Sequence, residues 1–238
     1  MESGAYEIMT TDGVEIFVQL LQNSPDGAVF NPWWEVDEQN DRNRNAPAVR
    51  RKQLAAYLDQ RLGKAKLILI GEALGYRGGH FSGIPMTSER ILLGKKRECG
   101  ITPEHVFSSI KACQTSTPKE CPNGFSEPTA TIVWSSLLGL GLKHQQFVLW
   151  NAFPWHSFVP RRGMLSNRMP TQKERSYGLP VLQAFLDLFS CDEIVALGNV
   201  AASQLEKLKV ESHRVRHPAS GGAKLFRQQI EKIVALLK

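Results

Sequence analysis

The chain has 238 residues, of which 42% are hydrophobic and 22% are charged, and its formal net charge is +6. This length and composition are typical of a folded protein with a sizeable core, and they exclude a disordered or collagen-like chain. The sequence contains no apolar run of the roughly 20 residues that a membrane span needs, and its basic character favours a polyanionic partner.

The N-terminal quarter predicts two helices joined by a polar arm. Residues 14–22 have the pattern of a short amphipathic helix, and residues 46–62 carry their apolar side chains on a helical period. Between them, residues 31–45 begin with Asn-Pro-Trp-Trp and are rich in turn formers, which favours an ordered loop. We therefore expect one domain over residues 1–238, with residues 1–62 as an extension packed on it.

The rest of the chain alternates between short apolar runs and helical patterns. Strands are expected at 67–70, 146–151, 193–198 and, at an edge, 210–216. Helices are expected at 89–94, 105–112, 129–140, 171–189, 199–208 and 223–238. This alternation predicts a three-layer α/β/α fold around a central, mainly parallel four-stranded sheet.

Residues 66–90 combine a predicted strand with a glycine-rich loop. The strand at 67–70 is followed within thirteen positions by Gly71, Gly75, Gly78, Gly79 and Gly83. Glycine at this density lets backbone amides approach a ligand closely, and Thr87 or Ser88 can cap the helix that follows. Ligands of open α/β sheets bind beyond the carboxyl ends of the strands, and Glu72 stands there. This segment is therefore the candidate site.

Three segments resemble the motifs of the uracil-DNA glycosylase superfamily. They are Gly-Glu-Ala-Leu-Gly at 71–75, Trp150-Asn151 at the end of a predicted strand, and His217-Pro218 in a later loop. The resemblance covers residues 66–238. It implies a monofunctional DNA-repair glycosylase, a monomer that flips uracil out of single- or double-stranded DNA and hydrolyses its N-glycosidic bond, leaving an abasic site.

The first motif is similar to the Gly-Glu-Ala-Pro-Gly of a bacterial, iron–sulfur branch of that superfamily, with Leu74 in place of the proline. The cluster of that branch needs four cysteines with a close N-terminal pair, whereas the first cysteine here is Cys99. We therefore expect no cluster and no other cofactor. The four cysteines show no Cys-x-x-Cys spacing and the start lacks a signal-peptide pattern, so we expect a cytoplasmic protein with no membrane association.

Breaking an N-glycosidic bond builds positive charge on the sugar and negative charge on the departing base. By the resemblance, Glu72 stabilises the sugar cation or activates a water, and neutral His217 donates a hydrogen bond to uracil O2. Asn151 reads O4 and N3–H of uracil, and since an amide can flip, we expect hydrogen bonds from the protein to hold it. From spacing alone, Glu72 is equally explained by bonds to loop amides, and Asn151 by a turn.

The resemblance also supplies the other uracil-binding candidates. They are Gly71, Ala73, Tyr76 and the aromatic residue Phe81. We expect Phe81 to stack on the flipped base, although a second alignment gives that place to Met86 and the ordinary fate of a phenylalanine is the core. Another branch excludes thymine with a tyrosine at the position of Gly75, so here Glu72 or Tyr76 must supply that wall.

Polar and basic residues of the loops at the strand ends form the candidate DNA-binding set. They are Arg77, Ser82, Ser88, Arg162, Ser220 and Gly221, together with His80, Arg161, Arg214 and Arg216. Such residues contact phosphates and supply most of the nonspecific affinity for DNA. In the superfamily the loop after this histidine often carries a leucine that enters the DNA duplex. Here the loop reads Ala-Ser-Gly-Gly and offers no such side chain. His213 and His217 have a spacing found in zinc sites, but without a Cys-x-x-Cys partner they do not predict a metal.

Two other functions stay open at this stage. A nucleotide- or dinucleotide-binding α/β enzyme could use the glycine-rich loop, although the GxGxxG and GxxxxGK[ST] patterns are absent from it. A catalytically silent member of the same fold would bind DNA and release no base. No lysine lies within the three motifs, so Schiff-base lyase chemistry is not expected.

Overall fold

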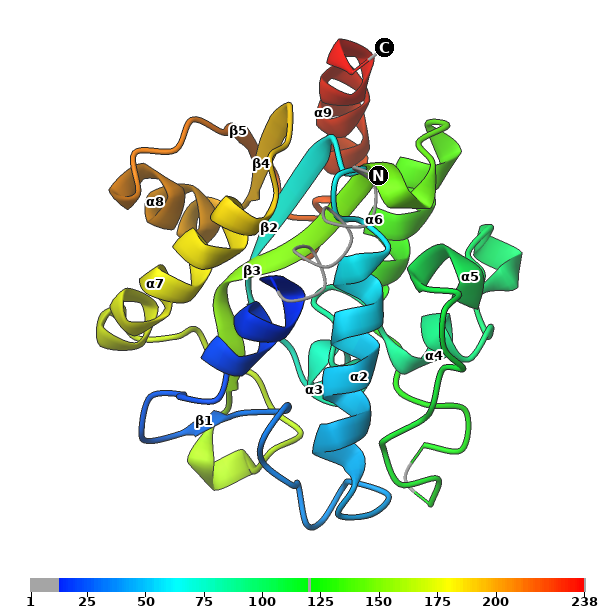
Figure 1. The fold of residues 1–238 in the computed structure, drawn as a ribbon, viewed down its shortest axis with the longest axis vertical. Helices are drawn as coiled ribbons and strands as arrows, with labels where there is room; N and C mark the ends of the chain where they lie inside the picture. The colour runs from blue at the N-terminus through cyan, green and yellow to red at the C-terminus, as the bar shows by residue number, and fades with distance from the viewer. Residues whose placement is uncertain (1–12, 120, 238) are drawn as a thin grey trace, which may run out of the picture.

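The computed structural model describes residues 13–119 and 121–237. Its centre is a sheet of five strands in the order β1-β3-β2-β4-β5 (Figure 1). The strands are β1 (Val29–Phe30), β2 (Leu67–Leu74), β3 (Phe147–Ser157), β4 (Glu193–Leu197) and β5 (His213–Val215). All neighbours run parallel except β1, which pairs antiparallel with β3. The predicted α/β class and mainly parallel sheet are confirmed, but the count of four strands is wrong, because the two residues of β1 are too few to show a strand pattern.

The two central strands extend beyond the apolar runs that predicted them. β2 continues past Ile70 to Leu74, and β3 continues past Asn151 to Ser157, with all its residues buried. Gly71 and Glu72 interrupt the apolar run of β2, and Pro154 interrupts that of β3, so neither extension was recognised as a strand. Glu72 consequently lies on a strand and not in the loop where the sequence placed it.

Helices cover both faces of the sheet. They are α2 (Ala46–Asp59), α3 (Gly79–Ser82), α4 (Glu89–Leu92), α5 (Pro103–Val106), α6 (Pro128–Gly139), α7 (Gln172–Leu188), α8 (Asn199–Lys207) and α9 (Ala223–Leu236), and a further helix covers residues 13–20. The helix predicted at 105–112 is wrong, since α5 is a single turn that begins at Pro103. The predicted helix at 171–189 is present as α7 and begins with a capping box, in which Thr171 and Glu174 each bond the other's backbone N–H.

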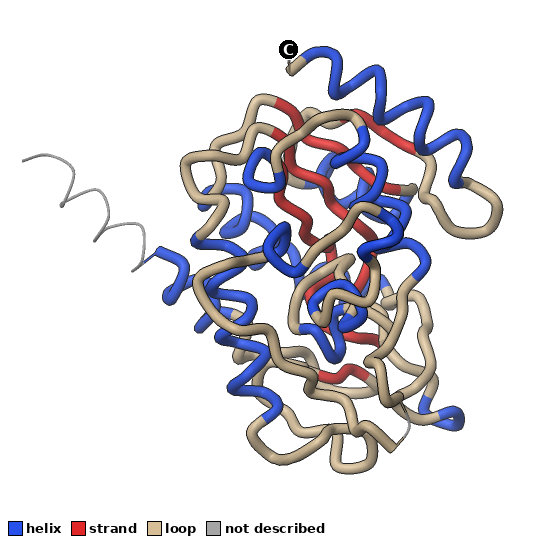
Figure 2. Tube along the Cα trace, turned by 90° about the vertical axis from the view of Figure 1, so that its right-hand side faces the viewer, coloured by secondary structure: helices blue, strands red, loops and turns tan. Residues whose placement is uncertain are grey.

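Aromatic contacts show how the layers pack. Phe17 and Phe185 contact Trp150 of β3, with ring centroids 5.1 and 4.8 Å away, whereas Trp134 of α6 contacts Phe147 at 5.1 Å. Residues 147 and 150 point to opposite faces of a strand, so the helix at 13–20 and α7 lie on one face and α6 on the other. The turned view of Figure 2 shows the strands within this shell of helices.

Residues 29–45 form an ordered arm that packs against the glycine-rich loop. The indole of Trp33 donates a hydrogen bond to the carbonyl oxygen of Gly83, at 3.0 Å. Arg50 of α2 is fully buried and pairs with Asp41 of the arm, at 2.6 Å. We call the following residues the arm network: Asp37, Asn40, Asp41, Arg50, His80 and His156.

None of the helices in the described part of the chain is both long and apolar enough to cross a membrane.

Candidate active site

The three motif residues Glu72, Asn151 and His217 line one cavity of about 430 Å³, near the carboxyl ends of β2 and β3. We call it the inner cavity. Gly71, Ala73, Met86 and Glu127 are also among its lining residues. The fold therefore brings together side chains that lie up to 145 positions apart in the sequence (217 − 72).

Asn151 presents an amide with no partner to this cavity. The residue is only 1% exposed, yet neither Oδ1 nor Nδ2 has a hydrogen-bond partner among the described residues. Its neighbour across the sheet is Gly71, where a Cβ would lie 2.5 Å from Oδ1. Glycine at position 71 thus makes room for the amide. The expectation that protein hydrogen bonds hold the amide is wrong, and both its donor and its acceptor are free for a ligand.

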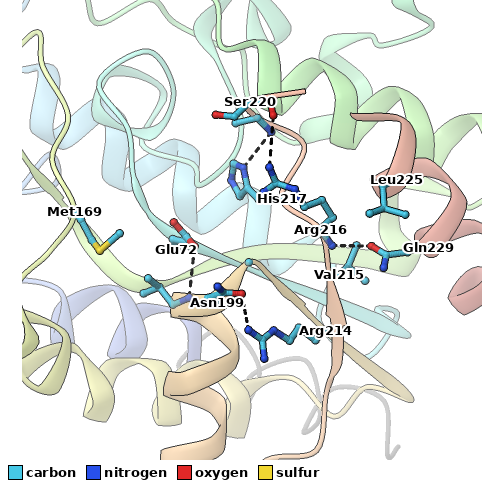
Figure 3. Close-up of a pocket in the computed structure, with 13 residues that line it drawn as sticks. Glu72, Met169, Asn199, Arg214, Val215, Arg216, His217, Ser220, Leu225 and Gln229 are labelled. Atoms are coloured by element: carbon cyan, nitrogen blue, oxygen red, sulfur yellow. Dashed lines mark hydrogen bonds between the residues drawn. The ribbon is translucent and has the colours of Figure 1, made fainter. Parts of the chain in front are cut away.

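Glu72 points toward the N-terminus of α8. Its Oε1 lies 3.5 Å from the backbone N of Val200, as the dashed line in Figure 3 shows. A Cβ at Gly198, whose φ is +90°, would lie 2.5 Å from the same oxygen, so a glycine is needed there. The positive end of the helix dipole favours a negative charge at this position.

His217 is held as a neutral imidazole with a defined proton. Its Nδ1 accepts a hydrogen bond from the backbone N–H of Ala219, at 3.2 Å. A nitrogen that accepts carries no proton, so we assign the ring proton to Nε2. Burial lowers the pKa of His217, and the nearby carboxylate of Glu72 only partly opposes this shift. At neutral pH the side chain is therefore an uncharged donor.

A second, outer cavity of about 690 Å³ adjoins the first. The two share Glu72, Met169, His217 and Ala219 in their linings. Arg214, Arg216 and Ser220 add polar groups to the outer one (Figure 3). Arg214 donates to the side chain of Asn199, at 2.6 Å. The site therefore consists of a smaller cavity that holds the three motif residues and an adjoining larger one whose lining includes two arginines.

Comparison with known protein families covers the segment that carries Glu72, Asn151 and His217. A sequence model of the uracil DNA glycosylase superfamily matches residues 60–237. The chain belongs to this superfamily. Among solved structures it resembles wild-type SMUG2 of Pedobacter heparinus, with a TM-score of 0.62 and 15% identity over 96% of this chain and 97% of that one. At that identity the likeness shows the fold alone. No curated protein sequence gives a significant match.

Membership of the superfamily confirms the family predicted from the three motifs, and with it a DNA glycosylase fold and DNA as a partner. The roles of individual residues stay predictions, whereas the position of each residue is given by the structure.

Phe81 does not lie where the sequence placed it. Its side chain is fully buried and stacks on Phe125, with ring centroids 4.5 Å apart and planes 5° from parallel. It does not line the inner cavity, whereas Met86 does. The short helix α3 directs Phe81 into the core. The second alignment, which places Met86 beside the base, agrees better with this structure.

The prediction that His80, Ser82 and Ser88 bind DNA is wrong, because these three residues have no exposed surface. The hydroxyl of Ser82 donates to the carbonyl oxygen of Thr87, at 2.6 Å, and so fixes the glycine-rich loop. His80 belongs to the arm network. Ser82 and His80 therefore bond within the protein, and all three side chains are inaccessible to DNA.

The remaining members of that set are exposed. They are Arg77, Arg161, Arg162, Arg214, Arg216, Ser220 and Gly221. Ser220 lines the outer cavity together with Arg214 and Arg216. Tyr76 is half-buried outside the inner cavity, and its hydroxyl accepts from Arg77 Nε at 2.9 Å.

Sequence reasoning missed Glu127, which precedes α6 and lines the inner cavity. Its Oε2 is buried without a hydrogen-bond partner among the described residues, and burial raises the pKa of Glu127 to about 7. A Cβ at Gly75 would lie 3.7 Å from Glu127 Oε1 and 3.6 Å from Asn167 Nδ2. These two residues border the place where another branch carries its tyrosine. Nothing in the sequence marked Glu127 beyond its place just before the helix predicted at 129–140.

Within the described ranges, no group of three or more His, Cys, Asp or Glu side chains is arranged to hold a metal ion. His213, the partner considered for His217, contacts Glu193.

Proposed function

We propose that this protein is a monofunctional uracil-DNA glycosylase, in which the inner cavity receives a flipped uracil and the outer cavity receives the flanking DNA backbone. The observation that carries this proposal is the free amide of Asn151 in a cavity that Glu72 and His217 also line. A buried donor and acceptor without protein partners are costly unless a ligand supplies both. The O4 and N3–H edge of uracil does so in one plane.

The glycosidic bond then lies where the two cavities meet. Glu72 and His217 line both compartments, so they flank a sugar whose base is inside and whose phosphates are outside. The carboxylate stabilises the oxocarbenium-like sugar and orients a water. The Nε2–H of His217 donates to O2 of the departing base, which stabilises its negative charge without transferring a proton.

The bond changes balance with water as the only co-reactant. The water oxygen bonds to C1′ while the C1′–N1 bond breaks. The electron pair of the broken C1′–N1 bond leaves with uracil. The proton released by the water ends on the uracil anion. No lysine lines either cavity in the described part of the chain, which supports hydrolysis over Schiff-base chemistry.

The wider expectations stay part of this proposal. The protein acts as a monomer and a single domain on uracil-containing DNA, and needs no cofactor. Its cytoplasmic location stays a prediction.

The proposal is tested with oligonucleotides that carry one uracil, thymine or cytosine at the same position, single-stranded and paired. We expect the full chain to release free uracil, identified by mass spectrometry, and to leave strands that break only after alkali. Failure to release uracil contradicts the proposal, and binding of the same DNA without release indicates the catalytically silent alternative. Strand cleavage before alkali contradicts the monofunctional mechanism.

A further inference from the structure

Met169 is a large apolar side chain that is 64% exposed at the mouth of the site. It lines both the inner and the outer cavity. In the view of Figure 3, Glu72 lies between Met169 and the loop of His217 and Ser220. Single exposed apolar residues are common on protein surfaces and by themselves mean little. The position of this one at the junction of two cavities is what requires an explanation.

The backbone on either side of Met169 is fixed. Arg168 pairs with both carboxylate oxygens of Glu174, at 2.7 and 2.6 Å, and its guanidinium also donates to the carbonyl oxygens of Phe158 and Ala28. Pro170 is buried and leads into the capped start of α7. The fold therefore presents one apolar side chain to solvent from a rigid support.

The loop on the other side of the site has no side chain of that kind. Residues 219–222 read Ala-Ser-Gly-Gly. Leu225 of α9 is 47% exposed, but it lines only the outer cavity. Among the exposed large apolar residues of the described chain, Met169 alone borders the inner cavity.

We infer that Met169 enters the DNA duplex and fills the space that a flipped nucleotide leaves. This inference rests on the proposed function. Extruding a base breaks its stacking and pairing, and apolar side chains such as Met offset this loss when they insert between base steps. A side chain beside the entrance of the base compartment, carried on a fixed backbone, is placed for that task.

A single strand has no pairing to break, so the contribution of Met169 depends on the DNA substrate. For Met169→Ala we expect uracil release to fall tenfold or more on a duplex with uracil opposite adenine, and less than threefold on a single strand. Met169→Leu keeps an apolar side chain of similar size and should stay within threefold of wild type on both. Leu236→Ala is the matched control, since Leu236 is 62% exposed and borders neither cavity.

A fluorescence measurement separates insertion from a general loss of activity. The duplex carries 2-aminopurine beside 2′-fluoro-2′-deoxyuridine, whose sugar resists hydrolysis because fluorine disfavours the sugar cation. Wild type and Met169→Leu should increase the fluorescence through unstacking, and Met169→Ala should give less than a third of that increase at saturating protein.

Equal losses on single- and double-stranded DNA, or a full fluorescence increase with Met169→Ala, would overturn the inference and leave the proposed function intact. Absence of uracil release by wild type from any substrate would instead refute the proposed function. Wild type that binds the duplex without changing its fluorescence overturns the insertion itself.

Discussion

The arm network and the inner cavity both contain buried polar side chains, but they differ in what those side chains contact. In the arm network, Arg50 pairs with Asp41, and His80 lies 3.2 Å from Asp37 and 2.9 Å from His156. In the inner cavity, the amide of Asn151 and one oxygen of Glu127 have no partner among the described residues. The polar side chains of the arm network contact one another and fix the glycine-rich loop. Those of the inner cavity are left free to bind a ligand.

This difference teaches that polarity in a motif loop does not by itself indicate function, and that what the side chain contacts must be known as well. His80 and Ser82 are as polar as Asn151 and lie in the glycine-rich loop just after the first motif, yet their contacts are internal. The buried histidines are also neutral, since burial lowers the pKa of His80 to about 3 and that of His156 to about 4. The arm network is therefore a structural element beside the site.

The largest effect is expected from breaking the arm network. Asp41→Ala leaves the guanidinium of Arg50 buried without its carboxylate, and loss of one partner of a buried pair costs about 3–5 kcal/mol of unfolding free energy. Urea denaturation measures this. Glu38→Ala removes an exposed pair with Arg44 and should cost about 0–1 kcal/mol. Similar losses in the two variants would mean that the buried pair has no special role.

The next effect concerns the inner cavity. Gly71→Ala places a Cβ 2.5 Å from Asn151 Oδ1 and 3.1 Å from Met86 Sδ, so the amide must move. We expect uracil release to fall about 100-fold, the loss typical of one misplaced donor in an active site, with only a modest change in stability. Gly139→Ala is the control, because nothing lies within 4 Å of its added Cβ. Parental activity in Gly71→Ala would show that the amide does not read the base.

A smaller effect follows from the carboxyl group of Glu127. Its folded pKa is raised from 4.5 to about 7, so the folded state holds a proton that the unfolded chain releases. The resulting stabilisation is complete below pH 4.5 and is lost as the pH rises through 7, by about 2 kcal/mol between pH 5 and 8. The buried histidines of the arm network act in the opposite sense, since their lowered pKa values stabilise the fold above pH 6.5.

Comparison of wild type with Glu127→Gln isolates this carboxyl group, because the histidines contribute equally to both. Denaturation at pH 5 and pH 8 should show the glutamine variant gaining stability relative to wild type at the higher pH. Parallel curves would mean that the Glu127 carboxyl is solvated in the folded state.

The smallest effect is expected at the outer cavity. Arg216→Ala removes one exposed cation from its lining, so DNA binding should weaken a few-fold for every sequence, and the slope of log K against log salt should fall by about 1. Fluorescence anisotropy over a salt series measures both. Arg227→Ala, an exposed arginine of α9 outside that cavity, should leave the slope unchanged. An equal change in both variants would exclude a specific phosphate contact.

The sequence predicted the sheet and the motif residues because both depend on local patterns. Apolar runs marked the strands of the parallel core, and the order of three short motifs indicated the superfamily. The strand extension beyond Ile70 begins with Gly71 and Glu72, and the one beyond Asn151 contains Pro154, so no uninterrupted apolar run revealed them.

The rest of the site depends on tertiary structure. The direction of Phe81 is set by the single turn of α3, and the inward rotation of Ser82 and Ser88 by the packing of the same loop. Glu127 and Met169 reach the cavity from segments that lie between the motifs, with no motif of their own. Long-range packing of this kind leaves no local signal in a single sequence.

The central claim is that the free amide of Asn151 and the Nε2–H of His217 act on one flipped uracil. Single-turnover release of uracil from a single-stranded oligonucleotide tests it most directly, with Asn151→Ala and His217→Ala compared with wild type at equal folded concentration. We expect each variant to be at least about 100-fold slower, in line with the loss of one stabilising group in an active site. Release at a near-parental rate in either variant would contradict the account.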